Sequence, residues 1–226
     1  VRESGFPYSS FGLVWQEYGE AVSGSREVME SLDEKIVQPV DAGDNGAALY
    51  TLNEYKIKPF ELYNVIKSFT PDDNTYADEM DKAFMQAVDF ARHLLERLIA
   101  YEKTQQEKMI EAEEIYNNST IESGILVLDK PISASYFSSF SDVAIVVKPD
   151  DEEGNKWIAT AVPVEGEIFV NRAEFPKSWA GLLDAKLQQA SGIPDAVFCH
   201  IKQFIFVAKS KDGALQAARQ ATIKLA

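Results

Sequence analysis

The pattern of apolar residues changes near residue 120, and this change divides the chain into two parts. Before it, apolar side chains recur at steps of three and four, which is the spacing of amphipathic helices. After it, they gather in short runs rich in Val, Ile, Phe and Trp, which is typical of strands. The sequence therefore predicts an all-helical front and an α/β back, which together make a mixed α/β (α+β) fold.

The helices of the front part are marked by their end signals as well as by periodicity. Ser9 and Ser10 offer an N-cap for the first helix, and Ser23-Gly24-Ser25 ends it. Pro39 is expected to end or kink the second helix just before a pair of aspartates. The predicted helices cover residues 10–22, 25–38, 59–68 and 76–116, the last as one long helix or two in line.

The back part is predicted to combine a mixed sheet with two helices. Lys202-Gln203 would be a tight hairpin turn between the last two strands. The predicted strands cover residues 125–128, 143–147, 157–162, 196–200 and 204–208, and the predicted helices cover 180–190 and 211–224.

The charge of the chain restricts its partners. The net charge is −14, and it is uneven: residues 156–226 hold 9 basic and 6 acidic residues, whereas the rest is strongly acidic. This balance does not suit a non-specific DNA coat, which needs clustered Lys and Arg. The single cysteine, Cys199, excludes an internal disulfide and favours a reducing, cytoplasmic compartment. No window approaches the length of a membrane span, and no signal peptide is visible.

Asp41 and Asp44, in the stretch Val40 to Gly46, are the first candidates for chemistry. Carboxylates three residues apart share a helix face and could hold a hard metal ion or position a water molecule. Asp-Asn-Gly is also a common turn sequence, so a solvated acidic pair is the alternative. Two carboxylates alone do not make a metal centre.

Two residues of the basic last third are candidates for binding an anion. Arg172 suits bidentate recognition of phosphate or carboxylate, unless it pairs with Glu174 on the surface. His200, at a strand end, could bind an anion or act as an acid or base, and a hydrogen-bonded structural histidine is the alternative. The sequence contains no Gly-rich nucleotide loop, nucleophile elbow or Cys-x-x-Cys pair.

Several segments occur together in an order that resembles a known family. They are Ser9–Trp15, Val40–Gly46, Asn171-Arg172, Pro176–Leu182, Ser191–Pro194, Phe198–His200 and Lys211–Leu215. In this order they resemble the Myg-type (melanocyte proliferating gene) family of metal-dependent hydrolases, a branch of the DHH phosphoesterase superfamily. The resemblance covers nearly the whole chain.

The resemblance implies a two-lobed hydrolase. Residues 1–58 would be the helical remainder of an N-terminal catalytic lobe, residues 59–120 a helical connector, and residues 121–226 a C-terminal α/β substrate-binding lobe. The family's His- and Asp-rich opening and its Asp-His-His signature are absent, so the chain is expected to begin just after that signature. The Gly-Gly-His-like turn of the second lobe is also absent; residues 204–209 stand in its place.

Site residues carry over by the same resemblance. Asp41 or Asp44 would match the last metal-associated aspartate, with Mn²⁺ or Mg²⁺ as cofactor, and both stand as catalytic candidates. Arg172 and His200 would bind substrate, and Lys209 or Arg172 would replace the missing turn.

The family's eukaryotic members are described as 3′-to-5′ RNA exonucleases of the nucleus and mitochondria, so we expect an RNA or oligonucleotide substrate and, in a eukaryote, one of those compartments. We also expect a homodimer to be supported by the long helix or by residues 138–147. The alternatives are a non-catalytic interaction module and a hydrolase of a small phosphorylated metabolite or cyclic dinucleotide. This stretch alone is expected to be inactive.

Overall fold

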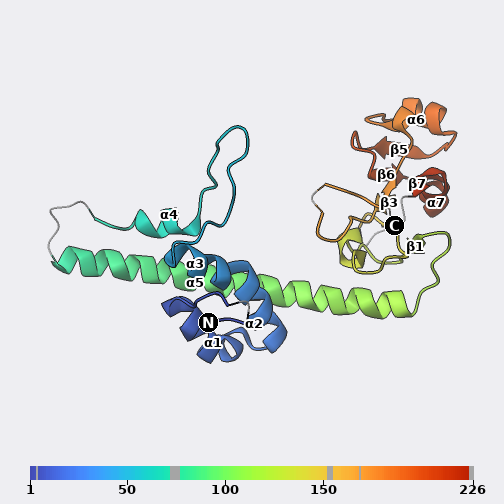
Figure 1. The fold of residues 1–226 in the computed structure, drawn as a ribbon. Coiled ribbons are helices and arrows are strands. Elements are labelled where there is room, and N and C mark those ends of the chain that lie inside the picture. Colours follow the sequence, from blue (N-terminus) through green and yellow to red (C-terminus); the bar gives the residue numbers. More distant parts are fainter. Residues whose placement is uncertain (4, 72–76, 152–154, 168, 224–226) are drawn as a thin grey trace. The chain divides into compact units, whose positions relative to one another are not determined.

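The computed structural model describes residues 1–3, 5–71, 77–151, 155–167 and 169–223 (Figure 1). Its contacts divide the chain into unit 1, Val1–Glu107, and unit 2, Lys108–Ala226. The mixed α/β class is confirmed. The division into three segments, with boundaries at 58 and 120, stays a prediction beside this division into two.

Unit 1 is helical, as its periodicity predicts. Ser9 caps the first helix, because its hydroxyl accepts a hydrogen bond from the Phe11 N–H, and Gly24 ends that helix in the left-handed conformation with φ of 84°. The helices are α1 (Ser10–Ser23), α2 (Arg26–Leu32), the π-helical turn η1 (Asp33–Val37), α3 (Gln38–Asp44), α4 (Leu62–Lys67) and the first part of α5 (Ala77–Asn117).

Pro39 was expected to end or kink the second helix, and the first of these alternatives is wrong, because the helical path continues through it. The chain passes from α2 through η1 into α3, and Pro39 lies in the first turn of α3. Proline lacks an N–H donor and is tolerated in a first turn, where an α-helical partner is not required. The wider π turn before it gives α3 a new start, so both Asp41 and Asp44 are helical residues.

A small core holds unit 1 together. Trp15, Val28, Leu32, Val37 and Ile99 are buried in one cluster. The indole N–H of Trp15 donates to the Met29 carbonyl at 3.2 Å. Phe11 of α1 also packs against this cluster, whereas Val14, Tyr18 and Val22 of the same helix are each more than half exposed.

Unit 2 is built on a five-stranded mixed sheet, as predicted. The strand order is β1-β2-β3-β6-β5; β1 and β2 are parallel and the other pairs are antiparallel. The strands are β1 (Ile125–Val127), β2 (Ile145–Pro149), β3 (Trp157–Ala161), β5 (Ala196–Cys199) and β6 (Ile205–Ala208). A second sheet pairs β4 (Ala173–Glu174) with β7 (Thr222–Ile223).

Two apolar clusters surround the main sheet of unit 2. The larger one includes α6 (Asp184–Ser191) and α7 (Lys211–Gln220), with Leu187, Phe206 and Ala217 fully buried. The other includes Phe137 and Ala112, the latter on the end of α5. The short helices η2 (Ala134–Phe137) and η3 (Lys177–Trp179) complete the unit.

The structure also bears on the surfaces expected to support a dimer. Residues 143–147 are buried, because they belong to the core of the sheet and its entry. Only residues 138–142 of the predicted stretch reach the surface. The single long helix over 76–116 is confirmed as α5 within its described residues. None of the described helices is long and apolar enough to cross a membrane.

Candidate functional site

Asp41 is a buried carboxylate of unit 1 that is hydrogen-bonded through both of its oxygens. Its side chain is fully buried. Oδ1 accepts hydrogen bonds from the Ser9 hydroxyl at 2.6 Å and from the Gly12 N–H at 3.0 Å. Oδ2 accepts from Arg2 Nη2 at 2.6 Å. Asp41 thus joins α3 to the first turn of α1, where free backbone N–H groups favour an anion.

Arg2 connects this carboxylate to the π turn. Its Nη1 donates to Asp33 Oδ2 at 2.5 Å, and Gln38 Nε2 donates to the same oxygen at 2.9 Å. The guanidinium carbon lies 4.5 Å from the centre of the Tyr8 ring. Only 9% of the Arg2 side chain is exposed. The positive charge of the buried Arg2 guanidinium is therefore balanced by the two carboxylates that bind it.

Gly12 is the residue that allows the approach of Asp41. A Cβ atom at position 12 would lie 2.1 Å from Asp41 Oδ2 and 2.7 Å from Oδ1. Burial by itself would raise the pKa of Asp41, but the hydrogen bonds from Ser9 and Arg2 outweigh it, so the pKa is lowered. Asp41 is therefore ionised at neutral pH, with both oxygens already engaged.

Asp44 differs from Asp41 although both lie on α3. It is exposed, and it forms no hydrogen bond or ion pair with any residue that the structure describes. Three residues apart on one helix, the two carboxylates have different surroundings: one lies in the packed interior and the other faces solvent. Of the two, Asp44 is the carboxylate whose oxygens are available to a ligand.

The described residues do not fit a resident metal ion by themselves. No group of three His, Cys, Asp or Glu side chains among them could enclose a metal. Asp44 offers one carboxylate, whereas Mg²⁺ and Ca²⁺ require six or more oxygen ligands, some of them from water. The metal role of Asp41 and Asp44 stays a prediction, and it requires ligands besides these residues.

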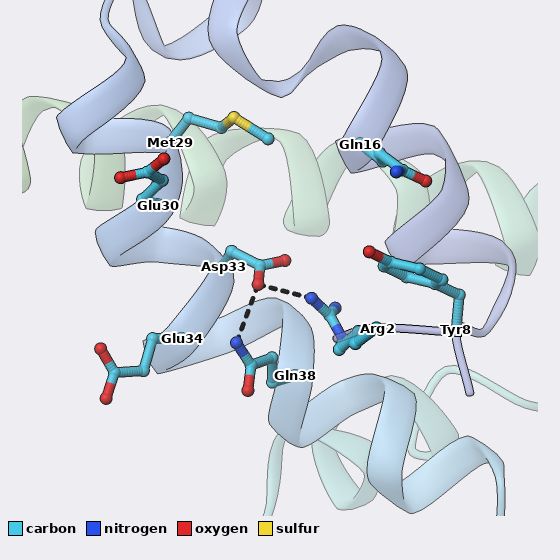
Figure 2. A pocket seen from close by; sticks show the side chains of 8 residues that line it. All are labelled: Arg2, Tyr8, Gln16, Met29, Glu30, Asp33, Glu34 and Gln38. Atoms are coloured by element: carbon cyan, nitrogen blue, oxygen red, sulfur yellow. Dashed lines mark hydrogen bonds and ion pairs between the residues drawn. The ribbon is translucent and has the colours of Figure 1, made fainter. Parts of the chain in front are cut away.

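A pocket of about 520 Å³ opens beside Arg2, bordered by α1, α2 and η1 (Figure 2). Figure 2 shows the guanidinium of Arg2 reaching from below Tyr8 toward Asp33, with Gln16 and Met29 on the opposite side. Its lining consists of Arg2, Tyr8, Gln16, Met29, Glu30, Asp33, Glu34 and Gln38. These side chains are mostly polar, so the pocket suits a polar ligand.

Arg172 lies in unit 2, where its guanidinium binds backbone carbonyls. Nη1 donates to the carbonyls of Phe140 at 2.5 Å and Val143 at 3.0 Å, and Nη2 donates to the carbonyl of Ser138. The side chain is half-buried. Arg172 therefore holds the turn between η2 and β2, a role that neither sequence-based alternative included. Its predicted contact with substrate is untested.

His200 and Lys209 lie at the two ends of the β5–β6 hairpin. His200 Nδ1 accepts from the Lys202 N–H at 3.0 Å, so the proton of its neutral ring is on Nε2. Its ring packs against Phe204, with 4.4 Å between centroids. The Lys209 side chain is exposed, and no hydrogen bond or ion pair within the described residues joins it to His200 or Arg172. Their predicted role in substrate binding is untested.

Cys199 next to His200 is a buried thiol. Burial raises its pKa to about 11, so little thiolate exists at neutral pH. This environment does not suit a catalytic thiolate.

The partners of Asp41 were the main omission of the sequence analysis. Arg2, Asp33 and Gln38 carry no local pattern that distinguishes them from surface residues. Gly12 offered a signal. A glycine inside a helix is about 1 kcal/mol less favourable than alanine, so its presence there suggests that another group approaches the backbone closely.

Comparison with known proteins identifies the family of the chain. Residues 1–222 match MYG1_exonuc, described as Uncharacterised protein family (UPF0160). A MYG1 protein of Schizosaccharomyces pombe is 26% identical over 94% of this chain and 72% of its own length. The human MYG1 exonuclease is 26% identical over 93% of this chain. A MYG1 protein of Chlamydia muridarum is 29% identical over 93% of this chain and 70% of its own.

The chain spans 62% of the length of the human protein. No solved structure matches the chain. The DHH superfamily link remains a prediction. The match over residues 1–222 confirms the Myg-type resemblance, and the chain belongs to the MYG1_exonuc (UPF0160) family.

Proposed function

We propose that this chain is part of a nuclease-type hydrolase that cleaves phosphodiester bonds in RNA or oligonucleotides from the 3′ end. The observation that carries the proposal is the family match, together with relatives named MYG1 exonuclease that align with more than nine-tenths of the chain. The DHH phosphoesterase link, the RNA substrate and a requirement for Mn²⁺ or Mg²⁺ are parts of the same proposal.

The two aspartates have different roles in this proposal. Asp41 is a positioning residue, because Ser9, Gly12 and Arg2 use both of its oxygens and fix the end of α3. Asp44, one turn further on, is the exposed carboxylate that would contribute to a metal site. A bound divalent ion would supply an activated water molecule and neutralise phosphate charge. Asp44 would need further ligands from outside the described groups.

Unit 2 would contribute to substrate binding through its hairpin. His200 presents Nε2–H as a donor, and Lys209 adds an exposed cation at the other end of the hairpin. Arg172 would act indirectly, since it holds the turn of residues 138–143. In this proposal His200 and Lys209 contact the substrate directly, and Arg172 acts through the turn that it holds.

The test uses the protein expressed from its complete reading frame. Progressive shortening of a 5′-labelled single-stranded RNA from its 3′ end is measured with Mn²⁺ and after chelation. We expect Asp44→Ala to lower the rate about 100-fold or more, the scale on which one electrostatic group acts in a transition state. The matched control is Asp81→Ala, another exposed aspartate of unit 1, which should leave the rate unchanged. Full activity in Asp44→Ala would refute the role of Asp44.

A non-catalytic interaction module is the second candidate. It is favoured by the lack of any metal-binding group of three side chains among the described residues. If the complete protein binds RNA but releases no nucleotide with Mn²⁺ or Mg²⁺, the module is the better description. Faster turnover of short dinucleotides than of RNA would instead indicate a small-substrate hydrolase.

A further inference from the structure

The main sheet of unit 2 is covered more completely on one face than on the other. Phe206 of β6 and Cys199 of β5 belong to the buried cluster that includes side chains of α6 and α7. Because successive side chains of a strand point to opposite faces, Val207 and Phe198 lie on the other face. Neither of these side chains, nor that of Ile158 on β3, belongs to a buried apolar cluster within the described residues.

The strand register aligns the side chains of this second face in a row. Ile158 is opposite Lys148 of β2 on one side and opposite Val207 on the other. Phe198 is opposite Val207 and, through an isolated bridge, opposite Leu183. Residues opposite each other in antiparallel pairs point to the same side of the sheet. We call the row the open face, and it consists of Lys148, Ile158, Val207, Phe198 and Leu183.

Most of the open face is apolar although no core cluster covers it. An antiparallel sheet with one face toward water normally carries polar residues on that face. β6 instead reads Ile-Phe-Val-Ala, apolar on both faces. Leu183 is 56% exposed, and Ile158, Val207 and Phe198 are half-buried. Apolar side chains that adjoin one another on a surface mark an interaction site, whereas scattered single ones do not.

Two aromatic rings adjoin one another on this side of the sheet. The His200 N–H donates to the Ile205 carbonyl, so the pairing of β5 with β6 continues to His200, whose side chain points the same way as that of Phe198. The two ring centroids are 6.2 Å apart and the rings are nearly perpendicular. Unpaired bases stack on such rings with little sequence preference, because every base has a flat π face.

Lysines border the open face. Lys148 is half-buried and forms no hydrogen bond or ion pair with any residue that the structure describes. Burial lowers its pKa, so an anion that approached it would stabilise the charged form. Lys156 and Lys209 are exposed beside the paired residues Trp157 and Ala208. The turn after β2 is acidic in sequence, so an anion is favoured along the row and toward Lys209 rather than at that turn.

We propose that the open face binds single-stranded RNA, with bases stacked on Phe198 and its apolar neighbours and phosphates near Lys148 and Lys209. This inference rests on the proposed nuclease function, because it names how unit 2 holds that substrate. Alternating flat apolar groups and anionic links match a row of apolar side chains bordered by lysines. Double-stranded RNA does not fit, because its bases stack on one another and offer no free face.

Binding is measured by fluorescence anisotropy with labelled oligouridylate, on the protein expressed from its complete reading frame and with metal chelated to prevent cleavage. We expect single-stranded RNA to bind at least about tenfold more tightly than the same strand paired with its complement. Phe198→Leu keeps an apolar side chain but removes the ring, and it should weaken binding about tenfold, the scale of one lost stacked base. Phe84→Leu, at an exposed position of unit 1, is the matched control and should leave binding unchanged. Equal affinity of Phe198→Leu and wild type would overturn the proposal.

A lysine variant tests the charged part of the open face separately. Lys148→Gln should weaken binding and reduce the slope of log affinity against log salt concentration by about 0.7, the value for one phosphate contact on a single strand. Lys186→Gln makes the same charge change on α6, which packs on the covered face, and should leave the slope unchanged. Equal slopes of the two variants would refute the contact at Lys148. Far-ultraviolet circular dichroism checks that each variant keeps its secondary structure.

The shortening of 5′-labelled RNA separates this inference from the proposed function. If the complete protein binds RNA through the open face but does not shorten it with Mn²⁺ or Mg²⁺, the nuclease proposal fails and the open face stands. If the protein shortens RNA while Phe198→Leu and Lys148→Gln bind and cleave it as wild type does, the open face is wrong and the nuclease proposal stands.

Discussion

Arg2 in unit 1 and Arg172 in unit 2 each bind several acceptors through the guanidinium group, but the acceptors differ in kind. The Arg2 side chain is buried and that of Arg172 is half-buried, and each joins segments far apart in the sequence. Arg2 binds the carboxylates of Asp33 and Asp41, whereas Arg172 binds the neutral carbonyls of Ser138, Phe140 and Val143. The first arrangement depends on the ionisation of its acceptors, and the second does not. The two units should therefore respond differently to mutation and to acid.

The largest effect is expected when the buried acceptor of Arg2 is removed. Asp41→Ala leaves the Arg2 charge buried with only Asp33, and it leaves the Ser9 hydroxyl and the Gly12 N–H without their acceptor. We expect the free energy of unfolding of unit 1 to fall by about 3–5 kcal/mol, as for other broken buried ion pairs. Hydrogen exchange followed by mass spectrometry reports on α1 and α3 directly.

The control for this change is on the same helix. Asp44→Ala removes an exposed carboxylate, so its effect on stability should stay within about 0.5 kcal/mol. If both substitutions destabilise α1 to the same degree, the contrast between a buried and an exposed aspartate is wrong.

The matching change in unit 2 should have a somewhat smaller effect. Arg172→Met keeps most of the side-chain volume but removes the guanidinium donor from three carbonyls; that of Phe140 still accepts from the Val143 N–H, whereas those of Ser138 and Val143 lose the donor described here. We expect a loss of about 2–3 kcal/mol in unit 2, because each group can partly recover a hydrogen bond to water. Faster hydrogen exchange of residues 138–147 is the measurement. Lys177→Met, at an exposed position of the same unit, is the control.

The sequence predicted the elements better than it predicted these contacts. The Ser9 cap and Gly24 stop defined α1, and the runs of Val and Ile defined β1, β2 and β3 within a few residues. These signals are local, because a helix end or a strand depends on neighbours in the chain. The contact between Arg2 and Asp41, which are 39 positions apart in the sequence, leaves no such pattern. The acceptors of Arg172 are backbone atoms, which any residue carries.

The exposed face of α1 shows the same limit. Val14, Tyr18 and Val22 have the spacing of a buried stripe, yet they are exposed while Trp15 is buried. Periodicity identifies an apolar face but not what covers it. The π turn η1 was also not predicted, because apolar spacing does not distinguish it from an α-helical turn.

A glycine comparison tests the close approach of Asp41 to α1. Gly12→Ala places a methyl group within 2.1 Å of Asp41 Oδ2, so we expect a loss of about 1–3 kcal/mol in unit 1. Gly43→Ala, on α3, meets no atom within 4 Å, and it should be neutral or stabilising by up to about 1 kcal/mol. Urea unfolding of both variants measures the difference. A destabilised Gly43→Ala with an unchanged Gly12→Ala would contradict the packing of Asp41.

The smallest effect is expected from pH, and it distinguishes the two arginines most directly. The folded pKa of Asp41 is lowered: burial opposes this, but the hydrogen bonds from Ser9 and Arg2 prevail. Glu102 behaves in the same way, with burial outweighed by Lys35 and Ser31. A group with a lowered folded pKa stabilises the protein above its unfolded pKa, near 4, and this contribution is lost as pH falls through the folded value.

Acidification from about pH 5 to pH 2 should therefore weaken the ion pair between Arg2 and Asp41. It should not weaken the hydrogen bonds from Arg172 to backbone carbonyls. We expect the stability difference between wild type and Asp41→Asn in unit 1 to shrink by on the order of 1 kcal/mol over this range. The difference between wild type and Arg172→Met in unit 2 should stay constant, because carbonyl oxygens do not titrate there. Hydrogen exchange at several pH values, corrected for the intrinsic exchange rate, gives both differences in one experiment. A constant difference for Asp41→Asn would mean that folding does not shift the pKa of this carboxylate, which would contradict its ion pair with Arg2.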